Sequence, residues 1–227
     1  LKGYGCPGLS YVAYGLICQE LERGDSGLRS FASVQGSLAM YPIWEFGTEE
    51  QKQRMLRPMA EGREKACFAV TEPNTGLNTT QLKTLAVRKG NRYIVNGQKV
   101  WISTAQVADK VLLLARTTPL EAVKKPTHGL SLFYTDFDRK KITVHEIEKM
   151  GRKAVDSNEL FIDGLEIPVE DRIGEEGKGF EYILHGMNPE RILIAGEAVG
   201  LGRAALNKAT QYAKERVVFN RSIGRSR

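Results

Sequence analysis

The 227-residue sequence lacks the features that mark membrane-spanning, disulfide-rich and zinc-binding proteins. No apolar run approaches the roughly 20 residues that a helix needs to cross a bilayer. The three cysteines, Cys6, Cys18 and Cys67, are odd in number and lack Cys-x-x-Cys spacing, and the three histidines show no ligand spacing. These absences argue against a membrane span, a disulfide scaffold and a metal site, and they favour a reducing compartment.

Charge is present in ordinary amount, with a mild excess of positive sign. The sequence is 41% hydrophobic and 26% charged, which is typical of a soluble globular protein, and its formal net charge is +6. This charge could serve acidic ligands such as phosphates, and nucleic acid is less favoured. Because the basic residues are scattered, a dispersed, solvated surface is the favoured explanation. The sequence opens at Leu1 without a methionine and stops at Arg227 after a helical pattern, so we expect it to belong to a longer chain.

The first quarter of the chain carries helical patterns. Apolar residues recur at helical spacing over residues 10–24, with Ser10 as the expected N-cap, and a second helix is predicted over residues 26–40. A Thr-x-x-Gln capping box predicts a further helix over residues 48–60. This part is therefore expected to be entirely helical.

Strand and turn signals follow, from residue 66 to residue 169. Apolar, β-branched and aromatic runs alternate with turn residues over this stretch. The dipeptide Asn96-Gly97 tolerates positive φ and stands between two such runs, so it predicts a tight hairpin. The strands are consecutive in sequence, which favours an antiparallel arrangement.

Helical patterns return near Gly174. Asn188 as N-cap and Pro189 at the first helical position predict the start of a separate helix that runs to about Phe219. The order of segments predicts an α+β fold. We expect an N-terminal helical domain (1–64), a middle antiparallel, barrel-like β-domain (65–173) and the start of a truncated C-terminal helical bundle (174–227).

Two of the strand-like runs end in groups suited to a flat, partly apolar ligand. The first, residues 68–76, stops at a proline and enters a turn, and the second, residues 100–104, ends in adjacent hydroxyls. If both lie in one sheet, their backbone amides and the side chains of Thr71, Trp101 and Ser103 could face one ligand. The alternative is a pair of ordinary core strands with solvated ends.

Six motifs occur along the chain in a specific order and spacing: FAVTEPNTG (68–76), NGQKVWIST (96–104), EKMGRKAVDS (148–157), ELFIDGLEIP (159–168), NPERILIAG (188–196) and KERVVFNR (214–221). In these motifs the sequence resembles the acyl-CoA dehydrogenase family over nearly its whole length. The resemblance implies FAD-dependent α,β-dehydrogenation of an acyl-CoA, electron transfer to electron-transfer flavoprotein, and a homotetramer or homodimer. It also implies a cytoplasmic or mitochondrial-matrix location.

The resemblance assigns FAD contacts to residues in these motifs. Thr71 would bond the pyrimidine edge of the flavin, Trp101 would pack on its rings, and Ser103 would bond near N5, where the hydride arrives. A hydroxyl suits that place because it can donate or accept a hydrogen bond. The other FAD residues implied are Phe68, Val70, Gly76, and the pair Arg216 and Phe219, which would reach the FAD of a neighbouring subunit.

The substrate class stays open. The opening of the sequence resembles the glutaryl-CoA dehydrogenase branch, in which the pair matched by Arg29 and Ser30 meets a distal carboxylate. The alternative for Arg29 is an exposed helix arginine. The second half resembles general bacterial enzymes for short or medium acyl chains. The substrate residues also implied are Leu77, at a position where the family commonly has serine, Asn188 and Arg191.

Two places are possible for the general base. One group of relatives has a glutamate at the position of Glu190, whereas most have theirs in a part of the bundle that would lie beyond Arg227. A glutamate in the first turn of a helix is also simply favoured by the helix dipole. Other possibilities within this fold are a glutaryl-CoA dehydrogenase that also decarboxylates, a non-catalytic assembly factor and a DNA-binding relative.

Overall fold

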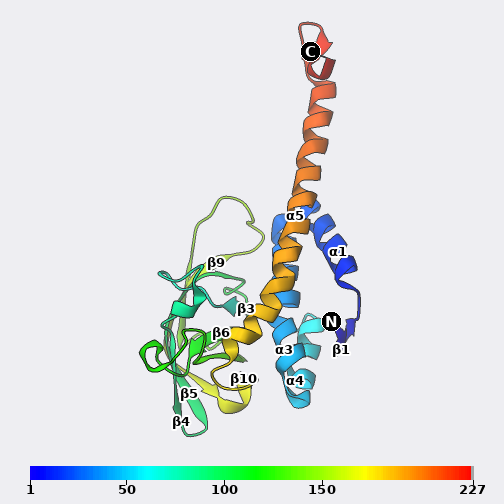
Figure 1. The fold of residues 1–227 in the computed structure, drawn as a ribbon. Coiled ribbons are helices and arrows are strands. Elements are labelled where there is room, and N and C mark those ends of the chain that lie inside the picture. The colour runs from blue at the N-terminus through cyan, green and yellow to red at the C-terminus, as the bar shows by residue number, and fades with distance from the viewer. Residues whose placement is uncertain (226–227) are drawn as a thin grey trace.

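The computed structural model describes residues 1–225 and confirms the α+β fold: N-terminal helices, a β-sheet and a long C-terminal helix (Figure 1). A short hairpin precedes the first helix. The N-terminal elements are β1 (Lys2–Gly3), β2 (Cys6–Pro7), α1 (Tyr11–Gly24), α2 (Ser26–Ser33), the π-helix η1 (Val34–Met40), α3 (Tyr41–Phe46) and α4 (Glu49–Ala60). Helix α5 (Gly179–Glu215) runs alongside α1, and its second half extends away from the rest of the molecule (Figure 1).

The predicted helix starts are confirmed by their hydrogen bonds. The hydroxyl of Ser10 accepts a bond of 3.2 Å from the amide of Ala13. Thr48 and Gln51 form the complete capping box, each side chain accepting a bond from the other's backbone amide. The second helix differs from its prediction, because it becomes a π-helix at Val34. π-helical turns occur frequently at functional sites.

The sheet lies beside the helices and, within the described residues, contains eight strands. Neighbouring strands are mostly antiparallel, as predicted, but β3 pairs with β6 in parallel. Buried side chains form one cluster inside the β-domain and a second between the sheet and the helices. The strands are β3 (Ala66–Ala69), β4 (Leu85–Lys89), β5 (Arg92–Ser103), β6 (Lys110–Arg116), β7 (Leu130–Asp136), β8 (Ile142–Glu146), β9 (Ser157–Pro168) and β10 (Arg172–Ile173).

The predicted hairpin at Asn96-Gly97 is wrong. Both residues lie inside the continuous strand β5, at an irregularity in its pairing with β9. The side chain of Asn96 accepts a 2.8 Å bond from the amide of Gly164, and a Cβ on Gly97 would lie 2.4 Å from Oγ1 of Thr84. The dipeptide therefore serves a β-bulge and a close contact, while the turn before β5 uses Gly90 at φ 62°.

The predicted helix start at Asn188-Pro189 is also wrong, because α5 continues through both residues. A proline inside a helix removes one backbone hydrogen bond. Packing holds the helix on both sides: a Cβ on Gly186 would lie 2.9 Å from the carbonyl oxygen of Ser37, and Leu193 is buried. Neighbouring elements thus compensate for the lost bond.

The prediction that the last helix runs to about Phe219 is wrong, because α5 ends at Glu215. A two-residue hairpin joins β11 (Val217–Val218) to β12 (Arg221–Ser222), followed by the short 3₁₀-helix η5 (Ile223–Arg225). Phe219 and Asn220 have φ of 51° and 60°, as a type I′ turn requires. Arg227, beyond which the alternative base was expected, lies outside the described residues.

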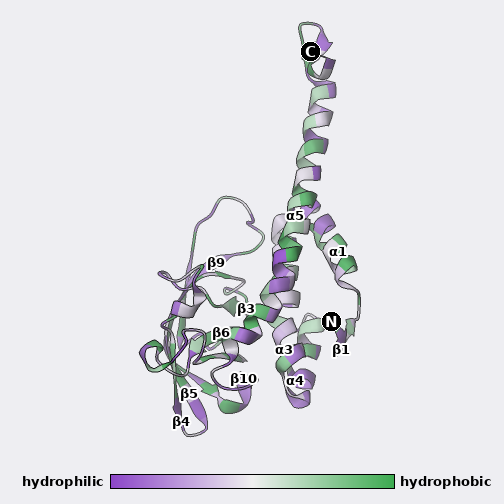
Figure 2. Cartoon of the chain, viewed as in Figure 1, coloured by the Kyte–Doolittle hydropathy of each residue, from purple (hydrophilic) through white to green (hydrophobic). Residues whose placement is uncertain are grey.

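Hydrophobic and hydrophilic residues alternate along α5 (Figure 2). Several apolar side chains on it are more than half exposed, among them Ile192, Leu201 and Leu206. Over residues 1–225, no helix combines the length and the apolar character that crossing a membrane requires.

Candidate functional site

The two predicted ligand-facing runs lie side by side. The amide of Val100 donates a 2.9 Å hydrogen bond to the carbonyl oxygen of Thr71, which joins the end of β5 to the residues after β3. The hydroxyl of Thr104 donates to the carbonyl oxygen of Ala66 at 3.0 Å. Gln35 of the π-helix bonds both backbone groups of Ala66, at 2.7 and 2.9 Å. The structure therefore brings Thr71 next to the last residues of β5, where Trp101 and Ser103 lie. Val70 is buried in the core between the sheet and the helices, and Phe68 packs against that core.

Trp101 is held in an unusual conformation. Its φ is 63°, in the left-handed region that costs a non-glycine residue about 1–2 kcal/mol. Yet 61% of Trp101 is exposed, so burial of the indole does not compensate for this cost. Thr104 also has positive φ, at 66°. Residues held in sparsely populated backbone conformations cluster at active sites and ligand-binding sites.

A buried ion pair lies directly beneath this edge, and the sequence analysis missed it. Nζ of Lys99 lies 3.0 Å from Oε1 of Glu72 and donates to the carbonyl oxygens of Val70 and Leu114 at 2.9 and 2.8 Å. Lys99 is completely buried. Lys99 lies within the apolar run of β5. A charged residue in such a run indicates a buried partner of opposite charge, and this was the signal available in the sequence.

The ionisation of this pair follows from its surroundings. Burial lowers the pKa of Lys99 to about 8, and the Glu72 carboxylate opposes the shift. Burial alone would raise the pKa of Glu72, but Lys99 and the backbone amides of Lys83 and Thr84 bring it below its ordinary value. The pair fixes the backbone on both sides of Thr71.

The turn after the first run is open to solvent. The backbone groups of Glu72 and Thr75 bond each other at 3.0 and 3.1 Å and close a tight turn. A Cβ on Gly76 would meet no atom within 4 Å, and Leu77 is fully exposed. Gly76 therefore borders open solvent, and Leu77 contributes no contact to the protein core.

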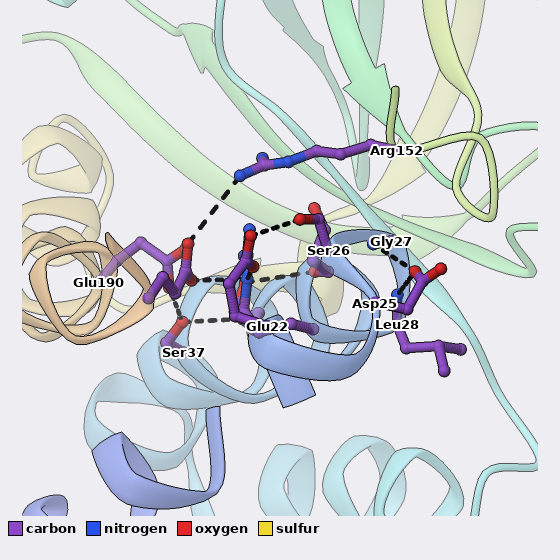
Figure 3. A network of polar contacts seen from close by, with 12 residues as sticks. Glu22, Asp25, Ser26, Gly27, Leu28, Ser37, Arg152 and Glu190 are labelled. Carbon is purple, nitrogen blue, oxygen red and sulfur yellow. Dashed lines mark hydrogen bonds and ion pairs between the residues drawn. The ribbon is translucent and has the colours of Figure 1, made fainter. Parts of the chain in front are cut away.

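Helix α5 carries the second group of predicted residues. The carboxylate of Glu190 accepts a hydrogen bond from the hydroxyl of Ser37 on the π-helix (Figure 3). Arg191 donates to the side-chain oxygen of Asn188 at 2.6 Å, and both are exposed. A cavity of about 380 Å³ between α1, α3 and α5 is lined by Tyr14 and Asn188, among others.

Arg29 is buried, so its interpretation as an exposed helix arginine is wrong. Its side chain is 2% exposed, and its Nε lies 2.8 Å from Glu22 and 2.7 Å from Glu197. Its Nη1 donates to the hydroxyl of Ser33 at 3.0 Å. Ser30 beside it is also buried. The sequence analysis missed both partners, and Glu197 is far from Arg29 in sequence.

Arg216 and Phe219 lie apart from the other predicted FAD residues. They belong to the exposed segment at the far end of α5, away from the β-domain (Figure 1). Phe219 lies in the turn between β11 and β12 and is 92% exposed. Within one chain, these two residues do not contribute to the place where Thr71 and Trp101 meet.

Family models match all three parts of the chain. The N-terminal domain of acyl-CoA dehydrogenases matches residues 2–63, the middle domain matches residues 67–165, and the C-terminal domain matches residues 177–227. The two matches flanking the middle domain cover the helices, and the middle match covers most of the sheet.

Relatives agree with these models. A short-chain-specific acyl-CoA dehydrogenase of Clostridium acetobutylicum is 36% identical, over 98% of this chain and 58% of the relative. Butyryl-CoA dehydrogenase from Megasphaera elsdenii superposes with a TM-score of 0.89 at 33% identity, over 97% of this chain and 57% of that one. Glutaryl-CoA dehydrogenase from Mycobacterium smegmatis gives 0.90 at 41% identity, over 99% and 56%. This chain spans less than two thirds of the length of each of these relatives. The three family models and the identity to these relatives show that the chain belongs to the acyl-CoA dehydrogenase family.

Proposed function

We propose that the protein oxidises the Cα–Cβ bond of a short- or medium-chain acyl-CoA to the 2-enoyl-CoA, with FAD as cofactor and electron-transfer flavoprotein as electron acceptor. The observation that carries the proposal is Trp101, exposed and in a left-handed conformation beside Thr71. The short-chain specificity named for the C. acetobutylicum relative supports the substrate class. The proposed location is a bacterial cytoplasm or a mitochondrial matrix.

The edge formed by β3 and β5 suits a flavin. It combines an exposed indole with hydroxyl side chains on a backbone fixed by the bond between Val100 and Thr71. A flavin held there would supply the acceptor for the hydride that leaves the acyl Cβ. We assign ring hydrogen bonds to Thr71 and Ser103 and ring packing to Trp101. The remaining residues of this proposed wall are Phe68, Val70 and Gly76.

Arg216 and Phe219 complete the proposed FAD site from another subunit. A guanidinium suits a phosphate of the cofactor, and an aromatic ring suits its adenine. Both residues are placed on an exposed hairpin at the far end of α5, where they are available to a second copy of the chain. This assignment requires a homodimer or homotetramer.

The proposed base is Glu190, with a residue beyond Arg227 as the alternative. The hydrogen bond from Ser37 orients the Glu190 carboxylate, which remains partly exposed at the junction of α5 and the π-helix. Its task would be to take the α-proton of the thioester while the hydride leaves. Asn188 and Arg191 would contact the CoA portion, and Leu77 the substrate above the turn.

Absorbance spectroscopy tests this proposal. The purified protein is expected to bind FAD and to lose its flavin absorbance anaerobically when butyryl-CoA is added. A Glu190→Gln variant should keep the flavin spectrum but not bleach, whereas unchanged bleaching would eliminate Glu190 as the base. A colourless protein that cannot take up FAD would refute the whole proposal.

Glutaryl-CoA oxidation with decarboxylation is the second candidate. It is favoured by the 41% identity to the M. smegmatis glutaryl-CoA dehydrogenase and by the pair Arg29 and Ser30. Against it stands the pairing of Arg29 with two carboxylates of its own chain. A comparison of butyryl-CoA with glutaryl-CoA as the bleaching substrate separates the two candidates.

A further inference from the structure

A buried charge cluster lies where α1, α2 and α5 meet (Figure 3). It contains Arg29, Glu22 and Glu197, whose side chains are 2%, 3% and 5% exposed, respectively. Nε of Arg29 lies 2.8 Å from Oε2 of Glu22 and 2.7 Å from Oε1 of Glu197. One guanidinium is thus shared by two carboxylates from different helices.

The cluster holds more negative charge than Arg29 can balance. Glu22 already has two donors, because it also accepts a hydrogen bond from the hydroxyl of Ser26. Glu197 is the second anion, and the nearest further cation is Arg152, half-exposed, with its Nη2 4.0 Å from Oε2 of Glu197. Burial raises the pKa of Glu197, as does the charge of Glu22, while Arg29 opposes the shift.

Arg29 and Glu197 are also incompletely bonded. Among the residues that the structure describes, neither Nη2 of Arg29 nor Oε1 of Glu197 has a hydrogen-bond partner, although both atoms are buried. Their close approach therefore satisfies charge without an aligned hydrogen bond. A guanidinium binds a carboxylate best through two parallel bonds, so Arg29 retains an unused donor beside Glu197.

The cluster and Glu190 belong to one polar strip. Glu190 and Glu197 are seven residues apart on α5, two turns or about 10 Å along the same face. The hydroxyl of Ser37 lies within hydrogen-bond distance of two acceptors, the Glu190 carboxylate and the carbonyl oxygen of Ser33, and its single hydrogen is shared between them. The hydroxyl of Ser33 in turn accepts a hydrogen bond from Nη1 of Arg29. An acyl chain whose α-carbon lay at Glu190 could direct its distal end toward Arg29.

We propose that Glu197 occupies the place that the distal carboxylate of a short dicarboxylic acyl thioester would take beside Arg29. The site then accepts an uncharged acyl end and rejects an acidic one, because a third carboxylate would enter a place where two carboxylates already share one buried guanidinium and the second cation, Arg152, is half-exposed. Glu197 is thus a specificity-determining residue. This inference rests on the proposed acyl-CoA dehydrogenase function.

The test compares butyryl-CoA with glutaryl-CoA as substrates of the full-chain FAD enzyme. The unmodified protein should prefer butyryl-CoA. Glu197→Gln, which keeps the shape and removes the charge, should raise kcat/KM for glutaryl-CoA relative to butyryl-CoA at least tenfold. Adding Arg29→Gln to that variant should abolish the gain. Glu20→Gln, at an exposed carboxylate of α1, is the matched control and should leave the ratio unchanged.

Other outcomes separate the inference from the function on which it rests. A protein that takes up no FAD, or is bleached by neither thioester, overturns the proposed function. An enzyme that is active but prefers glutaryl-CoA, or whose ratio is the same in Glu197→Gln, overturns only the inference. If Glu197→Gln fails to fold by circular dichroism, Glu197→Ala is measured in the same way. Glutaryl-CoA binding to the oxidised enzyme, followed by the flavin spectral shift, gives a readout independent of turnover and should tighten at least tenfold in the variant.

Discussion

Replacing Lys99 by methionine should destabilise the protein strongly. The change keeps an unbranched side chain but removes a charge that lies 3.0 Å from Glu72 and two bonds to carbonyl oxygens. At an effective dielectric constant near 20, the Coulomb attraction at that distance is about 5.5 kcal/mol, before the cost of burying the two charges is subtracted. Removing one partner of a buried pair typically costs about 3–5 kcal/mol, because the other charge stays buried. We expect a loss in that range for Lys99→Met.

Urea unfolding at pH 7, followed by circular dichroism, measures this loss. Lys89→Met, at an exposed position on β4, is the control and should change the free energy of unfolding by less than about 0.5 kcal/mol. The double variant Glu72→Gln with Lys99→Met should recover part of the loss, because no uncompensated carboxylate remains. A loss below about 1 kcal/mol for Lys99→Met would refute the reasoning.

The pH dependence gives a second check on the same pair. The pKa of Lys99 is about 8 in the folded state, and its ordinary value, which we take for the unfolded chain, is 10.5. Between pH 8 and pH 10.5 the unfolded chain therefore binds more protons than the folded protein. The contribution of Lys99 to stability therefore rises with pH over that window and is lost as pH falls through about 8. The stability gap between the unmodified protein and Lys99→Met should widen from pH 7.5 to pH 9.5, whereas a constant gap would contradict the assignment.

Three further substitutions test local features by thermal and urea unfolding. Thr48→Ala removes the N-cap of α4 and should cost about 1 kcal/mol, whereas no loss would show that the cap bond is not stabilising. Gly97→Ala would place a Cβ 2.4 Å from Oγ1 of Thr84 and should cost about 1–3 kcal/mol, partly restored by Thr84→Ala. Gly200→Ala would place a Cβ 2.3 Å from the carbonyl oxygen of Gln19 and should cost a similar amount despite alanine's helix propensity; a stabilised variant would contradict the close α1–α5 packing.

Features that depend on nearby residues could be predicted from the sequence. The N-caps Ser10 and Thr48 act within three residues of their partners, so their patterns were sufficient. The Asn96-Gly97 pattern misled because a glycine that permits a turn also permits a close contact. Thr84, the residue in close contact with Gly97, is brought near it by the folding of the sheet, and no local sequence pattern predicts that contact.

Charges buried between distant segments were beyond the sequence. Lys99 was visible as a charge in an apolar strand, but its partner Glu72 is identified only by the pairing of the β3 end with β5. The position of Glu22 one helix before Arg29 was readable, whereas Glu197 joins them only through the packing of α5 on α1 and α2. The same limit applied to Asn188, whose local helix-start pattern was overridden by packing along α5.

The Lys99–Glu72 pair and the Arg29 cluster differ in the ratio of buried positive to buried negative charges. This difference predicts opposite effects on stability when a charge is removed. Lys99 meets one carboxylate, so removing either charge should destabilise the fold. Arg29 meets two, and the pKa of Glu197 is raised by its burial and by Glu22. A carboxyl whose pKa is raised on folding stabilises the protein below its unfolded pKa, and this contribution is lost as pH rises through the folded pKa.

Glu197→Gln should therefore become relatively more stable as pH increases. The difference in free energy of unfolding, variant minus unmodified protein, should be more positive at pH 7 than at pH 4.5, because only the unmodified protein must keep a second buried anion. The lowered pKa of Glu22 acts in both proteins to a similar extent and should largely cancel in that difference. Urea unfolding at the two pH values measures it. A difference that is more negative at pH 7 would show that Glu197 binds Arg29 as a balanced partner, and the place beside Arg29 would then hold no surplus charge.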